Sequence, residues 1–139
     1  MKIKFIVSVL IMLMCINSYS QKTPLWMELG QSESKAKYYY DLTAGIFPKP
    51  DVFGVIKMWI RVVEPKMILS IKGKRTTYTN GVKMLLYEIK CKDREMRLSQ
   101  YVYYTSNGKL IDSGEDYESY STPVPGSIGS MIFSKYCID

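Results

Sequence analysis

Apolar and polar side chains alternate along two stretches in the middle of the chain. In residues 55–63, one face carries Ile56, Met58, Ile60 and Val62, and the other carries Lys57, Trp59 and Arg61. The alternation repeats in residues 84–91, where one face carries Leu85, Tyr87, Ile89 and Cys91. A period of two predicts antiparallel strands with one buried and one solvated face. We expect Pro65 to end the first strand.

Shorter stretches predict the rest of a sheet. Residues 25–30 are a short apolar run typical of an edge strand, and the tyrosines of residues 37–41 favour a strand. Glycines and prolines predict a loop over residues 43–54. Further strands are expected at residues 67–71, 94–105 and 109–113. One face of the 94–105 strand should carry Met96, Leu98, Val102 and Tyr104. Turns are expected at Asn80-Gly81, Lys92-Asp93 and Asn107-Gly108.

The last element has the period of a helix. Ser127 follows Pro125-Gly126 and is a candidate N-cap. One wide apolar face comes after it, formed by Ile128, Gly129, Ile132, Phe133, Tyr136 and Cys137. We therefore expect Ile132 and Phe133 in the core. Side chains on the solvated sheet face should be exposed, namely Lys57, Arg61 and Arg97.

The first twenty residues have the pattern of a secretory signal peptide. Lys2 and Lys4 form a charged start, residues 5–14 are apolar, and Ser18-Tyr19-Ser20 is a small-x-small cleavage site. Residues 21–139 would then form a single exported domain, located in the periplasm, on the outer surface or outside the cell.

The cysteines change meaning once this segment is removed. Cys15 lies inside the expected signal peptide, which leaves Cys91 and Cys137. An even pair in an exported domain indicates a disulfide, and both sulfur atoms should point from apolar faces into one core. Lipidation of Cys15 is the other interpretation. A lipoprotein signal has a small residue before its cysteine, whereas Met12-Leu13-Met14 stands here.

The composition argues against several classes of function. The chain has no histidine, which removes the commonest general base, the commonest zinc ligand and the Ser-His and Cys-His nucleophile pairs. We expect neither an enzyme nor a cofactor. No metal is expected either. The acidic residues Asp112, Glu115, Asp116 and Glu118 are candidate calcium ligands, but they do not have the spacing of a calcium-binding loop.

The charge adds little to this picture. The formal net charge of +6 falls to +4 without Lys2 and Lys4, a modest basic bias. No nucleic-acid motif accompanies it, so nucleic acid is not an expected partner. After the signal peptide, no apolar stretch approaches the length of a transmembrane span.

A series of short motifs follows one order along the chain. The motifs are Trp26, Tyr39-Tyr40-Asp41, Val55-Ile56-Lys57-Met58-Trp59-Ile60-Arg61, Glu88-Ile89-Lys90-Cys91, Arg94-Glu95-Met96-Arg97, Gly108-Lys109-Leu110-Ile111, Pro125-Gly126-Ser127 and Tyr136-Cys137. In order and spacing they resemble the surface-adhesin protein E-like domain family of secreted bacterial proteins. The resemblance covers nearly all of residues 21–139. It departs at Tyr120, where a tryptophan is expected before the helix.

The resemblance implies an α+β fold. An antiparallel β-sheet of about six strands would carry one C-terminal helix, packed on one face and tied by a disulfide between Cys91 and Cys137. The family's best-known member is an outer-surface adhesin for host matrix and serum proteins. The implied function is a secreted or cell-envelope module that binds a protein or glycan macromolecule. The alternative is a periplasmic accessory or structural protein whose partner is another envelope protein.

The first candidate binding region is the mixed-charge sheet face around Trp59. It includes Lys57 and Arg61 and, from a neighbouring strand, Arg97. An aromatic centre among charges suits a protein or glycan partner. The other interpretation is a solvated face on which Trp59 stacks with a cross-strand arginine.

The second candidate is a basic stretch that contains Lys72, Lys74 and Arg75. It suits an acidic polysaccharide, a phosphate group or an acidic partner loop, or it is a solvated loop without a partner. An exposed edge strand would also permit a homodimer.

Overall fold

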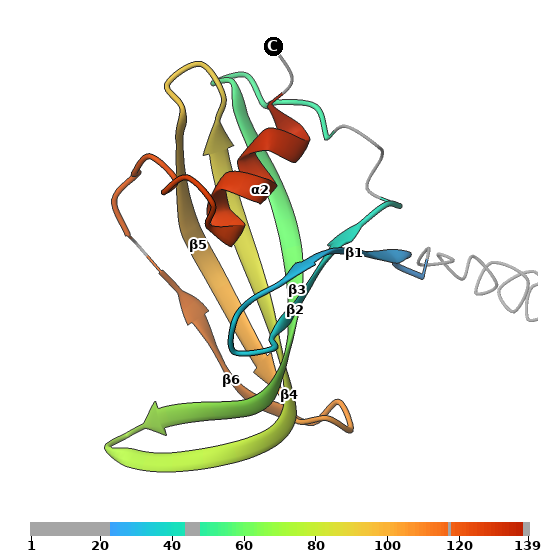
Figure 1. Ribbon diagram of the computed structural model, residues 1–139. Helices are drawn as coiled ribbons and strands as arrows, with labels where there is room; N and C mark the ends of the chain where they lie inside the picture. The colour runs from blue at the N-terminus through green and yellow to red at the C-terminus, as the bar shows by residue number, and fades with distance from the viewer. Residues whose placement is uncertain (1–22, 44–47, 117, 138–139) are drawn as a thin grey trace, which may run out of the picture.

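One antiparallel sheet runs through the molecule, and its strands lie in the order of the sequence (Figure 1). The structure is a computed structural model that describes residues 23–43, 48–116 and 118–137. Its strands are β1 (Trp26–Gln31), β2 (Lys37–Asp41), β3 (Val55–Ile71), β4 (Lys74–Lys90), β5 (Glu95–Tyr104) and β6 (Leu110–Glu115), and its helix is α2 (Ile128–Tyr136). The predicted α+β fold, with an antiparallel sheet and one C-terminal helix, is confirmed.

Helix α2 packs across one face of this sheet (Figure 1). Ser127 caps it, because its hydroxyl accepts a hydrogen bond of 3.2 Å from the amide of Ser130. Ile132 is fully buried, as predicted, whereas Phe133 is only partly buried and packs against the core. Tyr40, Ile56, Met58, Ile60, Val62, Ile89 and Met96 line the sheet side of this core.

A disulfide fastens the helix to the sheet. Cys91 directly follows β4 and Cys137 directly follows α2, and their sulfur atoms are bonded. The two Cα atoms lie 5.3 Å apart, which is ordinary for a disulfide. The predicted pairing of Cys91 with Cys137 is confirmed.

Strand β3 continues through Pro65, so the prediction that this proline ends the strand is wrong. Strand β2 pairs with β3 only from Ile60 to Val63. Beyond Val63, one side of β3 therefore has no neighbouring strand among the described residues. Proline has no backbone amide to donate. A strand tolerates it on an edge without a neighbouring strand, because no hydrogen bond between strands is lost there.

The turn between β3 and β4 lies at Lys72-Gly73, which makes the prediction of a turn at Asn80-Gly81 wrong. Ile71 pairs with Lys74, and the two residues between them have φ angles of 50° and 78°. Two positive φ angles are typical of a type I′ hairpin turn. Asn80 also has a positive φ, 51°, but it lies inside β4. Figure 1 shows that the paired strands β3 and β4 bend sharply in the half of the hairpin that ends in this turn.

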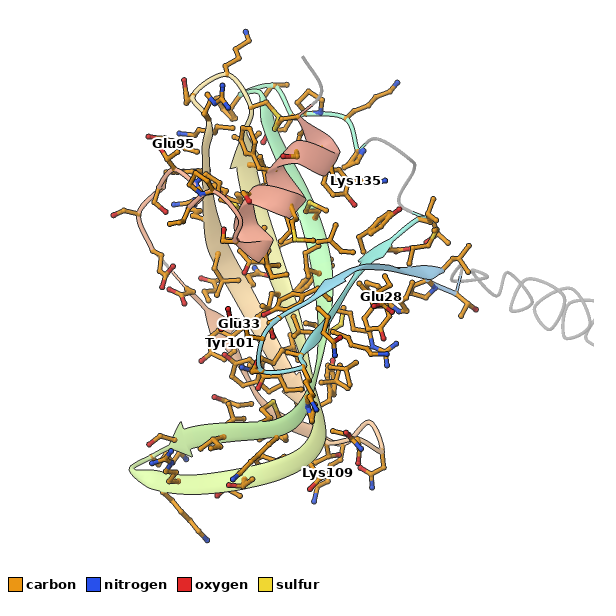
Figure 2. All side chains as sticks on the ribbon, in the orientation of Figure 1. Glu28, Glu33, Glu95, Tyr101, Lys109 and Lys135 are labelled. Carbon is orange, nitrogen blue, oxygen red and sulfur yellow. A yellow bond between two sulfur atoms is a disulfide. The ribbon has the colours of Figure 1, made fainter. Side chains whose placement is uncertain are left out.

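Strand β5 contains a β-bulge at Ser99. Leu98 pairs with Tyr87 of β4 and Gln100 pairs with Leu86, so Ser99 is an extra residue between the two pairs. Such a bulge shifts the alternation of side chains by one position. Tyr101 and Tyr103 therefore lie on the helix-bearing face. Figure 2 shows Tyr101 at a level between α2 and the turn of the β3–β4 hairpin. The prediction that Val102 and Tyr104 share a face with Met96 and Leu98 is wrong for this reason.

Two predictions fall on residues that the structure does not describe. The signal peptide, residues 1–20 with Cys15, lies outside the described residues, and so does the 44–47 part of the expected loop.

Candidate functional site

The outer half of the β3–β4 hairpin extends away from the rest of the sheet (Figure 1). We call residues 66–79 the arm. Its two strands pair from Lys66 with Thr79 to Ile71 with Lys74. Strand β2 has stopped pairing at Val63, and β5 pairs with β4 only from Val82 onward. Among the described residues, the arm strands therefore pair only with each other.

The arm has one covered and one open face. Met67 and Leu69 are buried on the covered face. Met67 packs closely over Gly81, where an added Cβ would clash with the methionine Cε. Ile68, between the two buried side chains, is exposed. The open face is exposed throughout and consists of Lys66, Ile68 and Ser70 with their partners Thr79, Thr77 and Arg75.

Positive charge dominates the arm. The sequence has no acidic residue between Glu64 and Glu88. Lys72, Lys74 and Arg75 lie around the turn at the end of the arm, and Lys66 adds a fourth cation at its base. In the described part of the chain, none of the four makes a salt bridge. A local field of one sign attracts acidic partners.

The helix-free face of the sheet has a buried acid at its centre. Glu88, 7 % exposed, accepts hydrogen bonds from Arg97 Nε at 2.9 Å and from the Tyr120 hydroxyl at 2.8 Å. Salt bridges join the same carboxylate to Arg97 Nη2 at 2.7 Å and to Lys57 Nζ at 3.2 Å. Two cations lie close to the Tyr120 ring, with Lys90 Nζ 3.9 Å and Arg97 Cζ 4.5 Å from its centroid.

This network sets the protonation of Glu88. Burial on its own would raise the pKa of the carboxyl group, but hydrogen bonds from Arg97, Tyr120 and Lys57 outweigh burial and lower the pKa below its ordinary value. The same carboxylate raises the pKa of Arg97. Glu88 therefore stays charged, and it occupies Lys57 and Arg97 with internal contacts.

Arg61 lies on the same face and has no such partner. Its guanidinium carbon lies 5.9 Å from the centre of the Tyr39 ring, and no described carboxylate forms a salt bridge with it. It lines a shallow hollow of about 300 Å³ together with Trp26, Met84, Tyr104 and Ser106. The hollow combines aromatic walls, a cation and hydroxyl groups.

The predicted site residues therefore lie in separate parts of the surface. Lys57 and Arg97 surround Glu88, Arg61 lines the hollow, and the basic stretch is on the arm. Trp59 is half-buried and, with Lys57, lines a small hollow of about 90 Å³. The arginines of this face do not stack on Trp59. Arg61 lies over the ring of Tyr39, and Arg97 lies over the ring of Tyr120. Lys57 is exposed as predicted, whereas Arg61 and Arg97 are half-buried.

Sequence reasoning missed two members of these surfaces. Lys66 belongs to the open face of the arm, and its place there follows from a strand that continues through Pro65. Tyr120 was noted only as a departure from the family pattern. Its contact with Glu88 spans 32 residues of sequence, so no local pattern could reveal it.

The described residues contain neither a metal-binding cluster nor a membrane-spanning helix. Within residues 23–43, 48–116 and 118–137, no group of three potential ligands among Cys, Asp and Glu could hold a metal ion. No helix in the same ranges has the length and apolar character needed to cross a membrane.

Comparison with known proteins identifies a family for this chain. The family model of surface-adhesin protein E matches residues 26–138, nearly the whole chain. Neither the curated proteins nor the solved structures gave a match. The matched range contains both bonded cysteines, the network around Glu88 and the arm. A surface-adhesin family implies an exported protein and supports a surface-adhesin-like role. The chain belongs to the surface-adhesin protein E family.

Proposed function

We propose that the protein is a binding module, without catalytic activity, that attaches to acidic macromolecules through its arm. The partner is a protein or a glycan, and the module acts in the cell envelope or outside the cell. Family membership supports the binding role. A fold shared within a family does not define the contact surface, because binding depends on surface residues. The charges of this chain point to the arm.

The arm's unpaired cations are the observation that carries the proposal. Lys66, Lys72, Lys74 and Arg75 project from the sheet with no acidic residue between them. Lys83, the next cation along the chain, is different, because it is bound to Glu64 at 2.7 Å. A projecting hairpin reaches a partner before the body of the protein does, and its free cations attract an acidic surface over about 8–10 Å at physiological salt.

The hollow next to Arg61 provides a second contact on the sheet face. Arg61 is free to pair with a carboxylate of the partner, and Trp26 offers a large apolar surface. Tryptophan, tyrosine and arginine are the residues that most often dominate the energy of an interface. Lys57 and Arg97 contribute less, because a partner would have to displace Glu88 from them.

The test is to remove the charge of the arm end. The variant Lys72→Gln/Lys74→Gln/Arg75→Gln is compared with wild type for binding to heparin, an acidic glycan, and to polyglutamate, an acidic polypeptide. We expect binding to at least one probe to weaken on the order of tenfold at low salt, and its salt dependence to flatten. The fold should be retained, since changes at exposed sites usually alter stability by less than about 0.5 kcal/mol.

A matched variant controls for net charge. Lys35→Gln/Lys37→Gln/Lys109→Gln removes three exposed cations from elsewhere and should leave binding nearly unchanged. Equal weakening by both triple variants, or by neither, would contradict a contact at the arm. Trp26→Ala and Arg61→Gln test the hollow in the same assay.

The location of the protein decides between a surface adhesin and a periplasmic accessory protein. Protease treatment of intact cells should cleave the protein if it acts at the outer surface. Resistance of the protein in intact cells, with cleavage after the outer membrane is opened, would instead indicate a periplasmic role with an envelope partner.

A further inference from the structure

Two adjacent apolar side chains are held in solvent at the turn that precedes β3. Val52 is 93 % exposed and Phe53 is 85 % exposed. Single exposed apolar residues are common on proteins, but a neighbouring valine and phenylalanine at this level of exposure indicate an interaction site. We call residues 51–54 the apolar tip.

The conformation of the tip is fixed by hydrogen bonds. One carboxylate oxygen of Asp51 accepts from the amides of Phe53 and Val55, each at 2.9 Å. The Gly54 amide donates to the Asp51 carbonyl, and the Asp51 amide donates to the Val55 carbonyl, again at 2.9 Å. Gly54 has a φ of 76°, a conformation that glycine adopts readily. The turn therefore presents Val52 and Phe53 outward as an ordered pair.

Basic side chains surround the tip. Val52 and Phe53 line one hollow of about 260 Å³ with Lys90, the last residue of β4, and with Lys92 and Asp93 of the turn between β4 and β5. Lys49 precedes the tip along the chain. Three cations, Lys49, Lys90 and Lys92, thus accompany two acids, and the carboxylate of Asp51 already accepts two amides. The surroundings of the apolar pair are net positive.

From this combination we propose that the apolar tip docks on the surface of an anionic phospholipid bilayer. Val52 and Phe53 enter the boundary between headgroups and acyl chains, while Lys49 and Lys92 contact the anionic headgroups. A protein partner fits less well, because two side chains offer far less than the roughly 800 Å² that each partner buries in a standard interface. Lipid needs no shaped counterpart.

The proposal gives the molecule an orientation. In Figure 1, the turn before β3 and the turn between β4 and β5 lie at one end of the long strands, and the arm lies at the other. A protein docked through the tip would hold the arm away from the bilayer. The two basic regions would then serve different surfaces, lipid at one end and a macromolecular partner at the other.

The test measures binding of the purified protein to vesicles. Vesicles of phosphatidylcholine alone are compared with vesicles of equal parts phosphatidylcholine and phosphatidylglycerol. We expect binding to the anionic vesicles only. Val52→Ser/Phe53→Ser should reduce it about tenfold or more, because two apolar side chains no longer leave water. Lys49→Gln/Lys92→Gln should also reduce it, by about fivefold for each lysine at low salt.

Matched controls separate the tip from other surfaces. Leu110→Ser/Val124→Ser removes two exposed apolar residues from elsewhere and should leave binding unchanged. The arm variant Lys72→Gln/Lys74→Gln/Arg75→Gln should retain insertion of the tip, so that failure of the tip and failure of the arm are distinguishable. Insertion is read from Phe53→Trp, whose emission should be quenched by lipids with brominated acyl chains, whereas Val124→Trp should not be quenched.

Three results would overturn the proposal. The first is equal vesicle binding by wild type and by Val52→Ser/Phe53→Ser. The second is bound Phe53→Trp protein without quenching by brominated lipid. The third is a wild-type protein that binds no vesicles but self-associates, together with a Val52→Ser/Phe53→Ser variant that does not self-associate. That result would identify a second copy of the chain as the occupant of the tip.

Discussion

The hydroxyl of Tyr120 donates a hydrogen bond of 2.8 Å to Oε2 of Glu88, although 32 residues separate them in the sequence. Tyr120 follows β6, and Ser121 beside it forms a β-bridge with Met96 of β5. The bridge brings the tyrosine ring over the helix-free face. The contact therefore connects the segment that leads into α2 with the middle strands of the sheet.

Glu88→Gln should destabilise the protein in a pH-dependent way. The folded state lowers the pKa of Glu88, so its charged form contributes stability that is present above the ordinary pKa and is lost as pH falls through the lowered value. We expect a loss of about 1.5–3 kcal/mol at neutral pH. Denaturant unfolding should show the difference between wild type and variant shrinking as the pH falls below 4.5, the ordinary pKa of a glutamate. A difference that stays constant over this range would contradict the role of the charge.

Tyr87 should ionise only in strongly alkaline solution. Burial, helped by nearby Tyr38, raises the pKa of its phenol to about 12. Because the folded pKa exceeds the unfolded one, the associated stability is fully present below about pH 10 and is lost as pH rises toward 12. The Tyr87 ring carbon signal, assigned by comparison with Tyr87→Phe, should report this titration in an NMR experiment. Titration near pH 10 would show that the phenol is solvated.

Cys137→Ser should cost about 2–5 kcal/mol of unfolding free energy and should loosen α2 first. The disulfide joins residues separated by 46 positions, and without it only packing holds the helix on the sheet. Chemical denaturation gives the free energy, and amide exchange in α2 gives the local effect. Wild type should contain no free thiol at Cys91 or Cys137. Reduction of wild type should reproduce the loss, whereas an unchanged midpoint after reduction would contradict it.

Gly81→Ala and Gly129→Ala should have opposite effects. At Gly81 a Cβ would clash with Cε of Met67 and lie 2.8 Å from its Cβ, so the base of the arm must shift, at a cost of about 1–3 kcal/mol. At Gly129 the nearest side-chain atom is 3.4 Å away, and alanine favours helix by up to about 1 kcal/mol. Thermal unfolding of the two variants provides the comparison. Equal stability would show that Met67 does not pack against Gly81.

Local patterns predicted most of the sheet because one of its faces is buried. Alternation in residues 55–63 and 84–91 gives the correct faces, and the apolar face of α2 gives Ile132 as a core residue. Pro65 was misread because its effect depends on whether a third strand pairs there, which is a property of the assembled sheet. Ser99 was missed for a similar reason, since a bulge exists only relative to a partner strand.

The candidate site was harder to predict than the fold. Sequence indicates which residues are charged, but not which charges are already paired. Lys57 and Arg61 are equivalent in the strand pattern, yet Lys57 contacts Glu88 and Arg61 has no salt bridge in the described part of the chain. The alternation in residues 84–91 puts Glu88 on the face opposite Tyr87 and Ile89, which predicts exposure. Glu88 is buried instead, because Tyr120 covers it.

The order of the strands has a consequence for how the chain folds. Each strand pairs with its neighbour in the sequence, so the sheet can grow by successive hairpins that each close a short segment, an arrangement that favours rapid folding. The helix differs, because it packs back on strands that come long before it. Cys137 follows all six strands, so Cys91 would remain a reactive thiol until the sheet and helix have met. Oxidation would then be the closing event of folding, and a chain stalled before it would be able to cross-link with a second copy through Cys91.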